Sequence, residues 1–145
     1  MKPPILLHEL TLAACPDSLP EVRSAARDAG KEAGFNQETV ESLALALNEA
    51  AMNVIQHGYH FATGKQMRLE VWLDETALTF DLIDQAPPVQ VDTVQSRSLD
   101  EIRPGGLGVH FIRSLMDKME FVDPPPGFGN RLRMVKFRRA SRHGT

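Results

Sequence analysis

The sequence of 145 residues is short of cysteine, of basic charge and of long apolar runs. Cys15 is its only cysteine, which excludes an intrachain disulfide and a thiolate metal cage and is consistent with a reducing cytoplasm. A formal net charge of −3 lacks the basic surplus typical of proteins that bind nucleic acid directly. The apolar N-terminal stretch is interrupted by His8 and Glu9, so we expect neither a membrane span nor a signal sequence.

Hydrophobic residues nevertheless make up 42% of the sequence and charged residues 24%, which is ordinary for a globular protein with a core of its own. The length fits one domain, and no linker, repeat or low-complexity tract interrupts it. We therefore expect a single domain over 1–145 with its core at about 5–138. A basic cluster near the C-terminus is interpreted as a solvated strand and end; it comprises Arg131, Arg133, Lys136, Arg138, Arg139 and Arg142.

Apolar periodicity and turn residues predict an order of elements that lacks alternating βαβ units. The predicted elements are strand 5–13, helices 18–33 and 36–58, strands 67–73 and 77–84, a short helix over 109–119, a short strand at 120–122 and a last strand 131–138. This order favours an α/β (α+β) two-layer sandwich, with helices on one face of a mixed, mostly antiparallel sheet. The polar segment at about 87–105 has no periodicity and is predicted to form a lid.

The helix predicted from Asn36 to Gly58 is apolar around most of its circumference but keeps a narrow polar stripe. The stripe consists of Glu49, Asn53, Gln56 and His57. Such a stripe forms either the wall of a polar pocket or a face turned to water, and the pattern alone does not choose between them.

Asp84 ends a strand whose apolar residues share its face, so the carboxylate is expected to point inward. An unpaired buried charge costs several kcal/mol, on the order of its desolvation penalty. Asp84 therefore needs a donor, which is either a ligand amine or the backbone of the following turn.

The run from Gly105 to Gly108 precedes a predicted helix, an arrangement that suits an anion because glycines admit close approach and helix N-termini attract negative charge. No Lys-Ser or Lys-Thr follows to make a Walker loop, and no strand directly precedes the glycines as a dinucleotide fold requires. A phosphate site and an ordinary glycine-rich turn both remain open.

Taken together and in this order, the segments ALNEAAMNVIQHGYH, LIDQAPPV and GGLGVHFIRSLMDKMEF resemble the sequence boxes of the GHKL, or histidine-kinase-like ATPase, superfamily. That resemblance implies a Bergerat-type ATP-binding fold. The compact length, the GGLG-helix-Met-Asp run and the closing strand GNRLRMVKFRR look most like anti-sigma-factor serine/threonine kinases of the RsbW type. No segment resembles the phosphoacceptor helix pair of a sensor histidine kinase, which disfavours that class.

The resemblance implies that the protein uses ATP and Mg²⁺. It implies that Glu49 is the general base, that Asn53 is the Mg²⁺ ligand and that Asp84 accepts from the adenine amino group. Arg103 in the lid would reach the γ-phosphate when the lid closes. The remaining residues that it places around the nucleotide are His57, Ala86, Gly105, Gly106, Leu107, Gly108, Val109 and Asn130.

Ala86 departs from the family, which usually has glycine at that position. If the backbone there needs a positive φ, alanine costs about 1–2 kcal/mol and weakens nucleotide binding.

The resemblance also implies partners. They are a sigma factor and an anti-anti-sigma antagonist of the STAS type, which the kinase phosphorylates, so that phosphorylation decides the choice of partner. The same resemblance implies a homodimer. One alternative is a non-catalytic nucleotide-binding module that switches partners by lid position. The least favoured is an ATP hydrolase of a larger machine, because no transducer domain is recognisable.

Overall fold

The computed structural model describes residues 2–89 and 106–139, with backbone alone for 106–110. The elements, in chain order, are β1 (Ile5–Ala13), a 3-10 turn η1 (Pro16–Ser18), α1 (Leu19–Glu32), α2 (Gln37–Asn53), a π-helical turn η2 (Val54–Gly58), β2 (Gln66–Leu73), β3 (Ala77–Asp84), α5 (Gly106–Leu115), β4 (Lys118–Val122) and β5 (Asn130–Phe137). The predicted order of strands and helices is confirmed.

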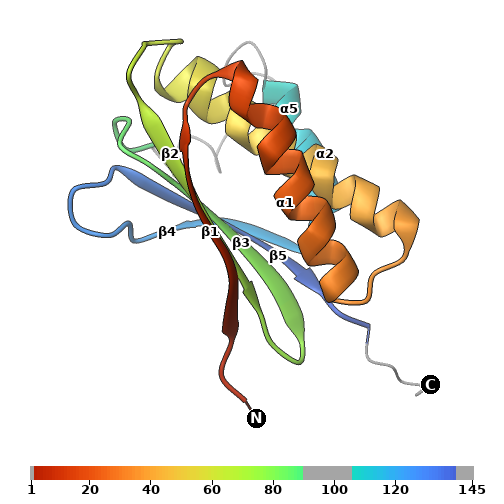
Figure 1. The fold of residues 1–145 in the computed structure, drawn as a ribbon. Coiled ribbons are helices and arrows are strands. Elements are labelled where there is room, and N and C mark those ends of the chain that lie inside the picture. The colour runs from red at the N-terminus through yellow and green to blue at the C-terminus, as the bar shows by residue number, and fades with distance from the viewer. Residues whose placement is uncertain (1, 90–105, 140–145) are drawn as a thin grey trace.

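The strands form one sheet of five in the order β1-β2-β3-β5-β4, and the helices lie on one face of it (Figure 1). The predicted two-layer sandwich is therefore confirmed. The expectation of a mixed sheet is wrong for the described residues, because all four pairings are antiparallel. The pairs β2–β3 and β4–β5 join strands that are consecutive in the chain, whereas helices separate β1 from β2 and β3 from β5. In the described ranges, no helix is long and apolar enough to cross a membrane.

The long predicted helix divides into two parts. Asn36 caps the N-terminus of α2, since its side-chain oxygen accepts from the Thr39 N–H at 2.8 Å. The α-helical pattern ends at Asn53 rather than Gly58, and Val54–Gly58 continues as a π-helical turn. Such turns often occur near functional sites, because the wider turn redirects the side chains that follow.

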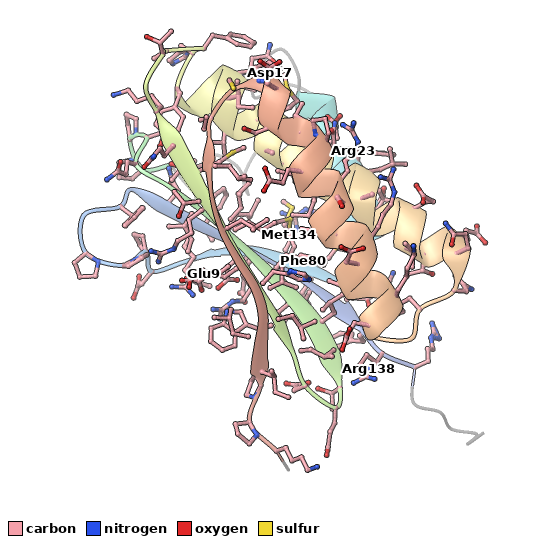
Figure 2. All side chains as sticks on the ribbon, viewed as in Figure 1. Glu9, Asp17, Arg23, Phe80, Met134 and Arg138 are labelled. Atoms are coloured by element: carbon pink, nitrogen blue, oxygen red, sulfur yellow. The ribbon has the colours of Figure 1, made fainter. Side chains whose placement is uncertain are left out.

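The core lies between the helices and the sheet. Phe80 and Met134 from neighbouring strands and Leu43 and Leu47 from α2 are all completely buried. Figure 2 shows Phe80 and Met134 on the helix side of the sheet, whereas Glu9 lies on the other side. Each such side chain contributes about 1.5–3 kcal/mol by leaving water.

The sheet face away from the helices carries a network of ion pairs. Asp81 is completely buried there, and its two oxygens accept from Arg131 Nε at 2.7 Å and from Arg133 Nε and Nη2 at 2.9 and 2.8 Å. Arg131 Nη2 also reaches Glu70 Oε1 at 3.0 Å. The interpretation of Arg131 and Arg133 as merely solvated is therefore wrong, because both guanidinium groups cover and neutralise buried carboxylates.

The Asp81 network predicts a specific loss of stability. Asp81→Asn removes the charge that two guanidinium groups share, so we expect the free energy of unfolding in urea to fall by about 2 kcal/mol. Glu120→Gln is the matched control, because Glu120 is exposed and faces Arg133 from β4. The control should change stability by less than about 0.5 kcal/mol. Equal effects of the two substitutions would contradict the importance of the buried pair.

Candidate functional site

The candidate site begins where β3 ends and β5 starts, with the side chain of Asp84 only 5% exposed. Asp84 Oδ1 accepts from the Ala86 N–H at 2.9 Å and from Asn130 Nδ2 at 3.0 Å. The turn after the strand thus supplies one of the donors that the sequence required. Within the described residues no hydrogen bond reaches Oδ2, which leaves that oxygen for a donor from elsewhere.

The electrostatics of Asp84 follow from this environment. Burial raises the pKa of the Asp84 carboxyl, and the hydrogen bonds from Asn130 and Ala86 oppose that rise. Both donors are uncharged amides. A further donor on Oδ2 would stabilise the ionised form, so the carboxylate is suited to bind an amino group.

Asn130 organises the chain that follows Asp84. Besides Asp84, its Nδ2 group donates to the Pro87 carbonyl at 3.1 Å, and its Oδ1 accepts from the Val89 N–H at 2.8 Å. The sequence places Asn130 beside the pocket, and the structure does bring it to Asp84. Its side-chain amide is occupied by the protein itself, so it shapes the wall of the site through the segment 86–89.

Ala86 is not strained in the way the sequence suggested. Among the described residues only His60 and Phe61 combine a side chain with a positive φ. The Ala86 methyl group is buried and packs on Gly58, where an added Cβ would lie 3.2 Å away from it. The need for glycine falls instead on Gly129, because a Cβ there would lie 1.8 Å from the Ala86 carbonyl oxygen.

The C-terminal half of α2 forms a second wall. Asn48 faces α1, where its Oδ1 accepts from Arg23 Nη1 at 2.8 Å, and Figure 2 shows Arg23 on α1. Ala46 is buried and lies about 200° around the axis of α2 from Asn48, and α5 is another helix that packs on α2, so we infer that Ala46 faces α5. Asn53 lies about two helical turns beyond Ala46 and therefore shares the side of α5. Gly58 then brings this end of α2 to Ala86, next to Asp84.

The predicted polar stripe is intermediate in burial rather than fully solvated. Glu49, Asn53 and His57 are half-buried, and Gln56 is exposed. Glu49 stands one helical turn before Asn53, so both side chains reach the same region. The stripe is thus neither a plain solvent face nor a closed pocket.

The C-terminal end of α5 is anchored at the end of β5. Lys136 Nζ, near the end of β5, donates to the Leu115 carbonyl at 3.2 Å. From this contact α5 extends beside α2 (Figure 1). The backbone of Gly106, Leu107, Gly108 and Val109 forms the first turn of this helix, whose N–H groups have no partner within the helix and attract anions.

Two predicted site residues, Arg103 and Gly105, lie outside the described residues, and so does the predicted lid from residue 90 onward.

The described ranges hold no cluster of three or more His, Cys, Asp or Glu side chains that could bind a magnesium ion by themselves. The amide oxygen of Asn53 is nevertheless a hard donor of the kind that Mg²⁺ accepts when phosphates and water complete its shell. Asn53 therefore fits a phosphate-bound magnesium ion.

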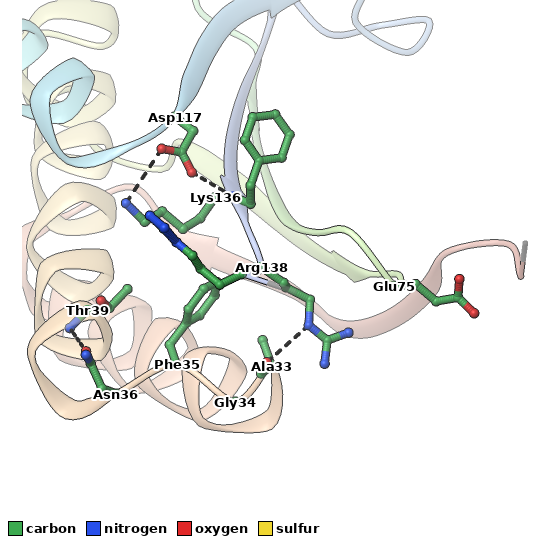
Figure 3. Close-up of a pocket in the computed structure, with 11 residues that line it drawn as sticks. Ala33, Gly34, Phe35, Asn36, Thr39, Glu75, Asp117, Lys136 and Arg138 are labelled. Carbon is green, nitrogen blue, oxygen red and sulfur yellow. Dashed lines mark hydrogen bonds and ion pairs between the residues drawn. The ribbon is translucent and has the colours of Figure 1, made fainter. Parts of the chain in front are cut away.

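A groove of about 1250 Å³ lies at the opposite end of the sheet. None of its lining residues is a predicted site residue (Figure 3). Its polar groups hold the fold: Lys136 pairs with Asp117, Arg138 Nε donates to the Ala33 carbonyl, and Asn36 caps α2. We therefore place the candidate site at Asp84 rather than in this groove.

Sequence reasoning missed Tyr59 and Gly129. Tyr59 is the only tyrosine and directly follows the polar stripe, a position that could have drawn attention. Gly129 precedes Asn130 in a proline- and glycine-rich turn, and its close approach to Ala86 is a tertiary contact without a local signal.

The chain is similar to several proteins of known name. The chain is similar to "Serine-protein kinase RsbW" of Halalkalibacterium halodurans, with 28% identity over 89% of this chain and 82% of that protein. Proteins with the same name from Bacillus velezensis and Bacillus subtilis are 25% and 24% identical over 94% and 77% of this chain, and over 90% and 74% of their own lengths. Residues 12–136 match the family described as the histidine kinase-like ATPase domain, and the chain therefore belongs to that family.

Proposed function

We propose that this protein is a cytoplasmic, ATP-dependent serine/threonine protein kinase that also acts as an anti-sigma factor. Its protein substrate is an anti-anti-sigma antagonist of the STAS type, and the other partner is a sigma factor. Membership of the histidine kinase-like ATPase family and the similarity to proteins named serine-protein kinase RsbW support this proposal.

The observation that carries the proposal is the buried Asp84 carboxylate with one oxygen left for an outside donor. An adenine amino group is a donor of the right kind. The first turn of α5 suits phosphates, while α2 brings Glu49 and Asn53 toward the same end of the sheet as Asp84.

Each residue then has a definite task. Asp84 orients the base, and the N-terminal turn of α5 receives phosphate oxygens. Asn53 would hold Mg²⁺, which neutralises phosphate charge when bound. Glu49, one turn away, accepts the proton of the serine hydroxyl as that oxygen attacks the γ-phosphorus, while the bond from the γ-phosphorus to the bridging oxygen breaks and ADP leaves.

Glu49→Gln tests the catalytic part of the proposal. The substitution keeps the size of the side chain but removes the base, so phosphate transfer from labelled ATP to a candidate antagonist should fall about 10²- to 10⁴-fold. Binding of Mg-ATP, measured by calorimetry, should change by less than about threefold, since Glu49 acts mainly in the transition state. Glu41→Gln is the matched control, because Glu41 lies on the same helix and pairs with Arg27 on α1. Nucleotide binding without any transfer by the wild type would favour the non-catalytic alternative.

Asp84→Asn should separate stability from binding. Because burial raises the pKa of Asp84, the folded state binds its proton more tightly than the unfolded chain, and ionisation at neutral pH weakens the fold. The uncharged amide avoids that cost. We expect a higher melting temperature than wild type at pH 7.5, and a difference that shrinks as the pH is lowered to 4.5.

The same substitution should weaken ATP binding at least about tenfold, since an amide oxygen is a poorer acceptor for the adenine amino group than a carboxylate. Calorimetric titration with Mg-ATP measures this loss. Undiminished ATP affinity in Asp84→Asn would rule out Asp84 as the base-recognition residue.

We also propose that the protein acts as a homodimer, by analogy with its family. Light scattering should then give twice the mass of one chain at micromolar concentrations. A single-chain mass across the accessible concentration range would remove the dimer from the proposal without affecting the nucleotide site.

A further inference from the structure

A single hydroxyl joins the turn after α2 to the turn after β3. Tyr59 directly follows η2, and its side chain is only 7% exposed. Its phenol oxygen donates to the Gln66 carbonyl at 2.7 Å and accepts from the Gln85 N–H at 2.7 Å. Burial raises the pKa of Tyr59, so the phenol keeps the proton that it donates at neutral pH.

The Gln85 N–H belongs to the peptide group that joins Asp84 to Gln85. The carbonyl oxygen of the same peptide group accepts from the Gly129 N–H at 2.8 Å. One peptide group directly after the Asp84 side chain is therefore held from both sides, by Tyr59 and by Gly129. The next N–H in the chain, that of Ala86, binds Asp84 Oδ1.

The backbone around Tyr59 is unusual in a way that brings the ring to this position. The Tyr59 N–H donates to the Val54 carbonyl at 2.9 Å, which closes the π-helical turn. His60 and Phe61 follow with φ of 52° and 59°, a region that side-chain-bearing residues rarely occupy. Such a conformation persists only where the surrounding structure holds it, and it is concentrated at functional sites.

We propose that Tyr59 is a positioning residue for purine recognition: its hydroxyl fixes the peptide between Asp84 and Gln85 and thereby orients the Asp84 carboxylate toward the 6-amino group of the base. This inference rests on the proposed nucleotide site. It adds a link between that carboxylate and α2, because Tyr59 lies on the turn that continues the helix of Glu49 and Asn53.

Tyr59→Phe is the direct test, because it removes the hydroxyl and keeps the buried ring. Calorimetry compares Mg-ATP with the Mg complex of purine riboside triphosphate, which lacks only the 6-amino group. We expect the affinity for ATP to fall about tenfold, since the Gln85 N–H loses its partner and the carboxylate its fixed orientation. The affinity for the analogue should stay within about twofold, so the preference for ATP collapses.

Thr76→Val is the control. It also deletes a hydrogen-bonded hydroxyl, the one that Thr76 directs to Asp74 at 3.0 Å in the turn between β2 and β3, at the far end of β3 from Asp84. The preference of this variant for ATP over the analogue should equal that of the wild type. A general loss of stability would weaken binding of both nucleotides alike, so the ratio of affinities separates positioning from a purely structural role.

The outcomes distinguish the inference from the function on which it rests. A wild type that binds neither nucleotide, or binds both equally, overturns the nucleotide proposal itself. A wild type that prefers ATP, together with a Tyr59→Phe variant of equal preference, overturns only the role of Tyr59.

Amide hydrogen exchange of the wild type provides a measurement that does not depend on the variant folding. The Gln85 N–H should exchange at least about tenfold more slowly than an unprotected amide, because the phenol oxygen binds it. Exchange as fast as that of an exposed loop amide would show that the hydrogen bond is absent and would overturn the inference.

Discussion

The burial of the Asp84 carboxylate on the core side of the sheet is the constraint around which this end of the molecule is built. A carboxylate in that position needs donors, because removing it from water is costly. The backbone of Ala86 and the amide of Asn130 supply them to one oxygen. Asn130 can do so because β5 pairs with β3 in a register that places it opposite Asp84. The same side-chain amide of Asn130 also hydrogen-bonds to the backbone of Pro87 and Val89. The residue that binds the Asp84 carboxylate therefore also positions the start of the predicted lid.

The two aspartates of β3 show how differently the protein treats a buried charge on its two faces. Asp84 lies three positions after Asp81 on the same strand, so the two side chains point to opposite sides of the sheet. Asp81 is neutralised by the guanidinium groups of Arg131 and Arg133. The described donors to Asp84 are uncharged. A fully neutralised carboxylate serves the fold, whereas one with a free oxygen and no cation is suited to a ligand.

α2 packs against two other helices and the sheet, so the residues on its different sides have different neighbours. One side meets α1 through the Arg23 to Asn48 hydrogen bond, a second side packs on the sheet, and helical geometry assigns the buried side of Ala46 to the contact with α5. Asn53 lies on the side of α5 near the end of the helix, and Glu49 is one turn before it. α5 packs beside α2, and its C-terminal end is anchored to β5 through Lys136. In the proposed function, this arrangement gives the nucleotide its base contact at Asp84 and its phosphate contact at the first turn of α5.

Local patterns in the sequence determined the elements and their order, because the period of two in 67–73 and 77–84 and the apolar run of α2 depend only on residues close in the chain. They also singled out Asp84, the polar stripe that contains Asn53 and the glycine run at the start of α5, and the family resemblance joined these features in one site.

Only the tertiary structure decided which groups meet. The sequence around Arg131 and Arg133 predicts solvated side chains, because their partner Asp81 lies on another strand. The expected strain at Ala86 was wrong, since the steric demand lies at Gly129, far along the chain. The hydrogen bond from the Gln85 N–H to Tyr59 was equally invisible, because strand register and the π-helical turn that create such contacts are set by packing between distant segments.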